Sequence, residues 1–200
     1  MTITAAADGS ALGNPGPAGW GWYIDANRWA AGGWPHGTNN QGELTAVLDL
    51  LTQTAHLPDD LVIYCDSQYA INSITKWTAG WKRRGWRKAD GKPVLNVEIM
   101  MALDASMTRL AAQGRKVEFR WVKGHAGHPL NEAADRLANG AAAAFARGET
   151  PDPGPGIAGG ARSGAAMLAS SQPGRHAADP TRPGRGAPDP GAASYPDTLF

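Results

Sequence analysis

Apolar and polar positions in the first 147 residues recur with the periods of strands and helices. The pattern predicts a first strand at Thr2–Asp8, then a hairpin or meander of two strands at Gly19–Asp25 and Arg28–Trp34. The near-continuous apolar run Leu61–Cys65 is typical of a strand that is buried on both faces, and Lys116–Val122 predicts one more strand. Antiparallel strands therefore come first in the chain.

Helices are expected between and after the later strands. In Asn40–Ala55 the apolar residues recur at spacings of three and four, as on one face of a helix. Ser67–Thr75 and Asn96–Ala112 also read as helices, and an alanine-rich helix is expected at Leu130–Arg147. Strands followed by alternating helices and strands predict a mixed sheet covered by helices.

The last quarter of the chain has a different composition. Residues 151–200 contain nine proline and nine glycine residues, no tryptophan and no lysine. Such a segment buries too little apolar area to offset the entropy of ordering it. We therefore predict one domain at residues 1–147 and a disordered tail at 148–200. The tail would either tether a partner, which the sequence does not identify, or have no role.

Charge and cysteine content narrow the class of protein. The formal net charge is +1, so the total says nothing about a polyanionic partner. The single cysteine, Cys65, excludes a disulfide framework and fits a reducing cytosol, and core filling explains it better than metal binding. No stretch is long and apolar enough for a membrane span, and the N-terminus has no signal-peptide pattern. We expect a cytoplasmic protein without a membrane partner.

Three acidic residues lie at positions that simple exposure to solvent does not explain well. Asp8 ends the first strand, Asp66 ends the apolar strand, and Glu43 lies in the first turn of a helix. Strand ends and helix N-termini gather into one crevice in such sheets, where clustered carboxylates need a hard divalent cation. The alternative is that Asp8 caps a turn, Asp66 caps a helix and Glu43 interacts with a helix dipole.

A glycine-rich loop follows the last predicted strand and carries two histidines. His125 lies at its tip, where it could move protons near a carboxylate cluster. His128 precedes Pro129 and is expected to be a structural residue at the start of the last helix.

These features occur as four blocks in a fixed order. The blocks are Ala7-Asp8-Gly9-Ser10 with Gly13-Asn14-Pro15-Gly16, Thr38-Asn39-Asn40-Gln41-Gly42-Glu43, Asp66-Ser67-Gln68-Tyr69, and Lys123-Gly124-His125-Ala126-Gly127-His128-Pro129 leading to Asn131-Glu132 and Asp135. Together they closely resemble type 1 ribonuclease H, in a match from about Thr2 to Ala146. The resemblance implies an α/β fold with a five-stranded mixed sheet, three antiparallel strands followed by parallel ones, and helices on both faces.

The resemblance also implies an activity and a catalytic site. The family hydrolyses the RNA strand of RNA–DNA hybrids with two Mg²⁺ ions, Mn²⁺ being a possible substitute, and leaves 3′-hydroxyl and 5′-phosphate ends. The resemblance places the family's four metal-binding acids at Asp8, Glu43, Asp66 and Asp135, with His125 as the loop histidine. Spacing alone would not single out Asp135, since a lone acid on an alanine-rich helix usually faces solvent.

By the same resemblance, Asn14, Asn39 and Gln68 contact the RNA strand, and amide groups suit 2′-hydroxyls because they both donate and accept. Ordinary turn chemistry before Pro15 is a second explanation of Asn14. Candidates for the DNA strand and its phosphates are Thr38, Ser67, Trp81 and Asn96. The family often has a basic residue two positions before the last acid, where this chain has Ala133.

A basic stretch between Lys76 and Lys92 adds evidence from charge. It contains seven basic residues and one acid, with three tryptophans interleaved. This composition suits a helix that follows a nucleic-acid backbone, and it matches the basic handle of some type 1 enzymes. A solvated helix with inward tryptophans is the alternative. The proposed handle residues are Lys82, Arg83, Arg84, Arg87 and Lys88.

Two other classes remain as alternatives. An integrase or a Holliday-junction resolvase shares clustered acids, but not the amide set at Asn14, Asn39 and Gln68 or the basic handle. A non-catalytic nucleic-acid-binding module would be suggested by loss of one of the four acids, and all four are present. We therefore expect a monomeric ribonuclease H that removes RNA from hybrids formed during replication and transcription.

Overall fold

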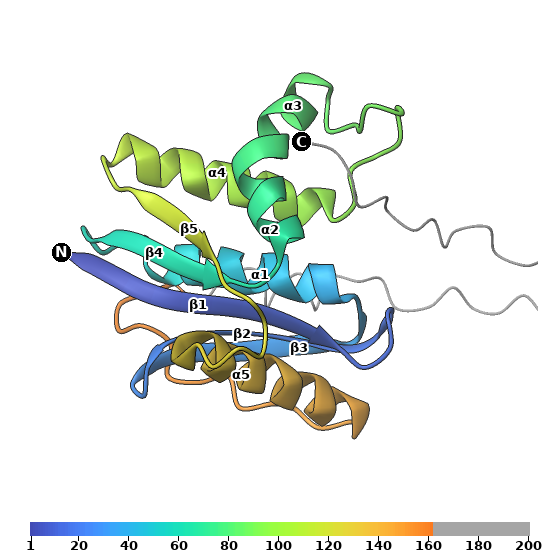
Figure 1. Cartoon of the computed structure of the whole chain (residues 1–200), viewed down its shortest axis with the longest axis vertical. Helices are drawn as coiled ribbons and strands as arrows, with labels where there is room; N and C mark the ends of the chain where they lie inside the picture. The colour runs from blue at the N-terminus through green and yellow to red at the C-terminus, as the bar shows by residue number, and fades with distance from the viewer. Residues whose placement is uncertain (162–200) are drawn as a thin grey trace, which may run out of the picture.

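A five-stranded mixed sheet forms the centre of the computed structural model, which describes residues 1–161 (Figure 1). The strand order is β3-β2-β1-β4-β5, with β1, β2 and β3 antiparallel and β1, β4 and β5 parallel. The fold class expected from the resemblance is thereby confirmed. The strands are β1 (Thr2–Ala11), β2 (Gly16–Asp25), β3 (Arg28–Gly37), β4 (Asp60–Cys65) and β5 (Val117–Trp121).

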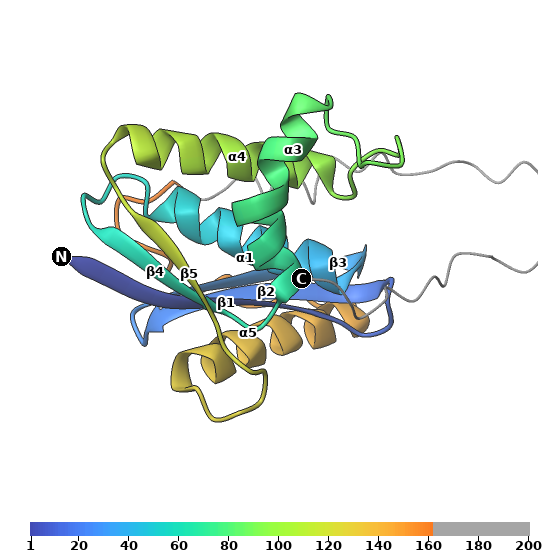
Figure 2. The ribbon, with the colours of Figure 1, turned by 45° about the horizontal axis from the view of Figure 1, so that its top comes forward.

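Helices cover both faces of this sheet. Figures 1 and 2 show α5 on one face, with α1 and α4 on the other and α2 and α3 leading away beside them. The helices are α1 (Asn39–Gln53), α2 (Gln68–Asn72), α3 (Thr78–Arg83), α4 (Val97–Ala112) and α5 (Pro129–Ala146), and the π-helical turn η1 (Ser73–Trp77) joins α2 to α3. Among the described residues, no helix is long and apolar enough to cross a membrane.

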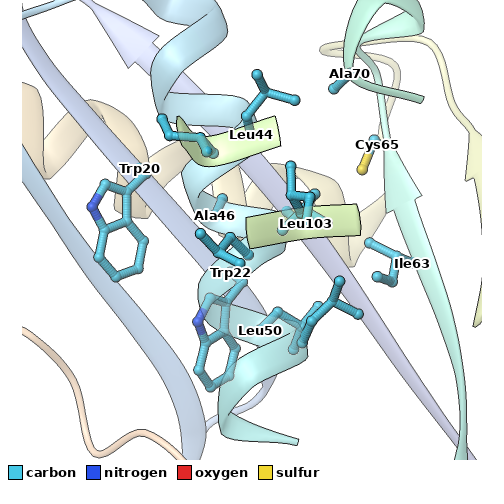
Figure 3. Close-up of a cluster of buried hydrophobic side chains, with 14 of the residues drawn as sticks. Trp20, Trp22, Leu44, Ala46, Leu50, Ile63, Cys65, Ala70 and Leu103 are labelled. Atoms are coloured by element: carbon cyan, nitrogen blue, oxygen red, sulfur yellow. The ribbon is translucent and has the colours of Figure 1, made fainter. Parts of the chain in front are cut away.

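The main core lies between the sheet and α1. Thr38 caps α1 by accepting a hydrogen bond from the Gln41 amide, and the apolar face that follows is buried. Figure 3 shows Trp20 and Trp22 of β2 beside Leu44 and Leu50 of α1. Cys65 is buried in the same cluster, as expected for a core-filling residue.

On the face of the sheet opposite α1, helix α5 lies close to the strands, because small residues of both elements meet there. A side chain at Gly19 of β2 would overlap the carbonyl oxygen of Ala138, and one at Gly21 would collide with Leu137. Ala134, Ala138 and Ala142 of α5 are fully buried. The alanine-rich composition of α5 thus lets this helix lie directly on the sheet, which sets the depth at which its polar residues stand.

The predicted elements are close to the observed ones, with three differences. Gly9 and Ser10 continue β1, although their residue types are typical of a turn. The basic stretch is not one helix, because α3 ends at Arg83 and residues 84–93 form a loop closed by a bridge between Arg87 and Pro93.

A third difference concerns the segment after α5. Residues 149–161, which we call the C-terminal strap (orange in Figure 1), run along the outer edge of β3. The Ala31 amide donates to the carbonyl oxygen of Pro153 at 3.3 Å, and the Gly156 amide donates to that of Trp29 at 3.0 Å. This part of the chain lies against the domain, although its composition predicts disorder. The rest of the predicted tail, 162–200, lies outside the described residues.

The strap is also tied to the core by a buried polar chain. The Trp22 indole donates to Asp49 at 2.7 Å, and the Gln53 amide donates to the same carboxylate oxygen at 2.8 Å. The oxygen of Gln53 accepts from the Ile157 backbone at 2.9 Å, and the Ile157 side chain is only 8% exposed. The strap therefore completes a hydrogen-bond network that α1 and β2 leave open.

Candidate active site

Three carboxylates meet just beyond the point where the parallel pairing of β1 and β4 ends. Asp8 belongs to β1, Asp66 directly follows β4, and Glu43 is the fifth residue of α1, just beyond the first turn in which the sequence placed it. Because β1 and β4 are parallel neighbours with Ala6 opposite Tyr64, the two aspartates are brought level with each other. Oxygen atoms of all three acids lie within 4.8 Å of one another.

Glycines allow Glu43 to approach so closely. A side chain at Gly9 would lie 2.2 Å from the Glu43 backbone nitrogen, and one at Gly42 would lie 2.5 Å from the carbonyl oxygen of Gly19. The N-terminal turn of α1 therefore rests directly on the backbone of the sheet. This close contact explains why Gly9 and Gly42 flank the two acids in the sequence.

Burial and mutual repulsion change the acid strength of this cluster. Burial, reinforced by Asp66 and Glu43, raises the pKa of Asp8 to about 8, although the Gly9 amide donates to it. Burial also raises the pKa of Glu43 to about 7, against the opposing effect of hydrogen bonds from Ser67 and Asn39. Near neutral pH the metal-free cluster therefore retains protons that a cation would displace.

The donor set fits a hard divalent cation. Every ligand atom offered by Asp8, Glu43 and Asp66 is a carboxylate oxygen, which Mg²⁺ and Mn²⁺ prefer over sulfur ligands. The acids are buried or half-buried, and repulsion between their charges is relieved only by protons or by a cation. The arrangement could therefore hold a divalent cation.

Asp135 and His125 stand at the margin of the cluster. Asp135 of α5 lies outside the 4.8 Å group but close enough to raise the pKa of Asp8. Nδ1 of His125 lies 3.9 Å from Asp135, and the His125 side chain is 80% exposed. Its φ of 52° is uncommon for a residue other than glycine, as is typical of functional loops. The loop also passes close to the cluster, because a side chain at Gly124 would lie 2.6 Å from Asp66 Oδ2.

His128 has the structural role expected from its sequence position. It is the N-cap of α5, and its Nδ1 accepts a hydrogen bond from the Asn131 amide at 3.4 Å. Its ring also packs on Tyr64, with centroids 4.3 Å apart.

The amide residues expected to contact RNA lie beside Glu43 and at the start of α2. Asn39 donates from its side chain to Glu43 at 2.7 Å, and its backbone amide donates to Asn14 at 3.2 Å. Gln68 is the first residue of α2 and is exposed. Asn14 and Asn39 are thus connected to the acid cluster, whereas Gln68 lines a groove that also includes Trp77 and Trp81.

The residues expected to contact DNA occupy two helix starts and two cavities. Thr38 and Ser67 are the N-caps of α1 and α2. Asn96, with a φ of 54°, lines a cavity of about 260 Å³ that also includes Trp34. Trp81 is only 9% exposed, although it borders a groove of about 560 Å³. The groove is lined by Asn40, Gln68, Tyr69, Asn72, Trp77, Trp81, Lys88, Val94 and Leu95.

Three of the handle residues form ion pairs or hydrogen bonds within the protein. Lys82 forms an ion pair with Asp104 of α4 at 2.7 Å. Arg84 donates to the carbonyl oxygen of Arg87, and Arg87 donates to that of Gly91, so both guanidinium groups also stabilise the handle loop. Arg83 and the two loop arginines are exposed.

Sequence reasoning missed two amides that contact the acids. Asn131 reaches Asp66 and Asn139 reaches Asp135, both from α5. Their four-residue spacing around Asp135 places all three on one helix face, a signal that was visible in the sequence.

The sheet topology and the buried acidic cluster together define an α/β protein with a candidate metal centre. The family model for RNase H matches residues 1–143. The chain belongs to the RNase H family, as a ribonuclease H of the bacterial type 1 group.

Individual relatives agree with this assignment. The chain is 54% identical to the Ribonuclease H of Tropheryma whipplei (strain Twist) over 154 residues, which cover 77% of this chain and 92% of that protein. It is 46% identical to the Ribonuclease HI of Caulobacter vibrioides over 140 residues, 68% of this chain and 90% of that one. Among solved structures it resembles LC9-RNase H1, a type 1 RNase H with the type 2 active-site motif. That match has a TM-score of 0.57 at 28% identity and covers 85% of this chain and 82% of the other.

Proposed function

We propose that this protein hydrolyses the RNA strand of RNA–DNA hybrids by two-metal phosphodiester hydrolysis, leaving 3′-hydroxyl and 5′-phosphate ends. The observation that carries the proposal is the approach of Asp8, Glu43 and Asp66 to within 4.8 Å, just beyond the end of the parallel β1–β4 pairing. The relatives named Ribonuclease H support the choice of substrate.

Asp8, Glu43 and Asp66 would hold the metal, and Asp135 would complete the site from α5. When bound there, Mg²⁺ or Mn²⁺ would supply neutralisation of phosphate charge, activation of water and stabilisation of the leaving 3′-oxygen. The protein's own part is to keep four carboxylates ionised and aligned. Ser67 and Asn39 assist because their hydrogen bonds to Glu43 favour its charged form.

His125 would move protons between the site and solvent and would assist product release. Its exposed imidazole lies near Asp135 on a loop that begins beside Asp66. A neutral imidazole accepts a proton and an imidazolium donates one near neutral pH, which suits this role. Loss of His125 would therefore slow turnover without abolishing metal binding.

The amides of Asn14, Asn39 and Gln68 would recognise 2′-hydroxyl groups of the RNA strand. The Asn39 side chain contacts Glu43, so a hydroxyl bound there would lie next to a metal-holding carboxylate. Recognition of the ribose and alignment of the phosphate would then be coupled through one side chain.

The DNA strand would be held by Thr38, Ser67, Trp81 and Asn96, together with the basic handle. Thr38 and Ser67 stand at helix N-termini, which favour phosphate. Since Trp81 is largely buried, it would contribute one edge to the groove rather than an open stacking face. The handle would add charge at Arg83, Arg84, Arg87 and Lys88, whereas Lys82 is already paired with Asp104.

The proposal is tested with matched RNA–DNA, RNA–RNA and DNA–DNA duplexes in the presence of Mg²⁺. We expect cleavage of the RNA strand of the hybrid alone. Asp66→Asn should lower kcat by roughly 10³-fold or more while the circular dichroism spectrum stays unchanged, because one metal-holding charge is removed. Asp25→Asn, at the last residue of β2, where the carboxylate pairs with Arg28, is the matched control.

Two results would contradict the proposal. Cleavage of duplex DNA would favour an integrase or resolvase, and normal hybrid cleavage by folded Asp66→Asn protein would remove the acid cluster from the mechanism. In the cell, the activity fits removal of RNA from hybrids formed during replication and transcription, by a monomeric cytoplasmic enzyme.

A further inference from the structure

One face of α5 presents an amide, an acid and an amide in succession. Asn131, Asp135 and Asn139 follow one another at intervals of four residues, so they lie on one side of the helix. The alanine residues of α5 pack against the sheet and hold this polar row at the edge of the acid cluster. The metal site described above uses Asp135 and leaves the two amides without a role.

Asn131 points its nitrogen at the cluster. Its Nδ2 lies 3.5 Å from Oδ2 of Asp66, in a long hydrogen bond, and the residue is only 3% exposed. Its Oδ1 is buried and has no hydrogen-bond partner. A buried acceptor without a partner costs stability, so this amide adds little to the stability of the fold and is better explained by a role at the site.

Asn139 joins the fourth acid to the sheet. Its Nδ2 donates to Oδ1 of Asp135 at 2.8 Å, and its Oδ1 accepts a hydrogen bond from the Ser10 hydroxyl. Ser10 is two residues beyond Asp8 on β1. Asn139 thereby ties the carboxylate of Asp135 to the same strand that carries the most buried acid of the cluster.

We propose that Asn131 and Asn139 are positioning residues that orient the carboxylates of Asp66 and Asp135 for the metal. Each amide donates to one carboxylate oxygen and restricts its rotation, which leaves the other oxygen to face a cation. An amide suits this task because it carries no charge, whereas lysine or arginine would neutralise the acid and repel the metal. The inference rests on the proposed function, since it assigns the amides to that same metal site.

The experiment measures metal binding to the full chain without nucleic acid. Mg²⁺ and Mn²⁺ are titrated by calorimetry into the wild type, Asn131→Ala and Asn139→Ala. We expect each substitution to weaken binding by roughly 10-fold, the lower end of what removal of a group that orients a metal ligand costs. Activity on the hybrid should fall at limiting metal and return toward wild type when metal is saturating.

Two features keep the result interpretable. Asn139 is exposed, so Asn139→Ala should fold with an unchanged Tm even if Asn131→Ala does not. Gly140→Ala is the control, because an added methyl group there meets nothing within 4 Å and should leave metal affinity unchanged.

The outcomes separate the two proposals. Equal metal affinity of wild type and Asn139→Ala, with the wild type binding metal, would overturn the positioning role and leave the proposed function standing. A wild-type chain that binds neither cation would overturn both. Weaker binding in Asn139→Ala with unchanged Tm and an unchanged control would support the inference.

Discussion

The pKa of Asp8 illustrates how strongly the acidity of one carboxylate depends on its neighbours. In isolation Asp8 would be ionised well below neutral pH, but burial and three nearby acids raise its pKa to about 8 in the folded protein without metal. The same residue is stabilised as an anion only when a cation joins the cluster. Metal binding and protonation therefore compete for one site.

This competition predicts how stability depends on pH without metal. Between about pH 4 and pH 8, folded Asp8 retains a proton that the unfolded chain has released, so the free energy of unfolding falls as pH rises through this range. Urea unfolding in EDTA should show a difference on the order of several kcal/mol between pH 5 and pH 9. Asp8→Asn should reduce that difference, and Mg²⁺ should add stability mainly at the higher pH. Equal stability at both pH values in EDTA would contradict the raised pKa.

At the scale of elements, two short segments, the basic handle and the C-terminal strap, have structures that the periodicity of the sequence does not predict. The handle consists of η1, α3 and the loop 84–93 rather than one helix, and its internal hydrogen bonds use two of its arginines. The strap consists mainly of glycine and proline, and it pairs with β3 through its backbone. Both segments depend on contacts that a helical or strand period does not reveal.

Neutralising the handle tests its role in binding. The triple change of Arg83, Arg84 and Arg87 to glutamine should raise KM more than it lowers kcat, because these charges are remote from the acids. The slope of log KM against log salt should fall by about 1 for each phosphate that the variant no longer neutralises. Arg109→Gln, an exposed arginine of α4, provides the control. An unchanged KM in the triple variant would exclude the handle from substrate binding.

Removing the strap tests whether it belongs to the folded domain. Ile157→Ala should lower the free energy of unfolding by about 2–4 kcal/mol, since it empties a buried site. A chain ending at Arg147 should be destabilised further, because Gln53 is also left without its backbone partner. A chain ending at Ala161 retains the strap and is the control. Equal urea midpoints for the two truncated chains would show that the strap adds nothing.

At the scale of the whole molecule, opposite charges are separated in space. The acids gather at the ends of β1 and β4, and the basic residues gather on the handle beyond α2, so the net charge of +1 conceals both. The sheet has two edges, β3 and β5, and the strap covers part of the β3 edge. Covered or charged edges oppose pairing between copies of a chain.

The full chain is therefore expected to be monomeric in sedimentation equilibrium. The chain ending at Arg147 should associate more strongly as its concentration rises, because the amide of Ala31 and the carbonyl of Trp29 are uncovered. Identical monomeric behaviour of both chains would mean that the strap does not protect this edge.

The sequence by itself determined the order and type of most elements, the family, and the three acids that the structure brings together, because apolar periodicity and short motifs are local properties of the chain. Only the tertiary structure decided that Asn131 and Asn139 touch Asp66 and Asp135, that Lys82 is paired with Asp104, and that Trp81 is largely buried. The tertiary structure also decided that residues 149–161 pair with the edge of β3. Their composition predicts disorder because they have too few apolar side chains for a core of their own. Their order comes instead from the open edge of β3 and the unfilled acceptor of Gln53, which exist only once the distant strands and α1 have assembled.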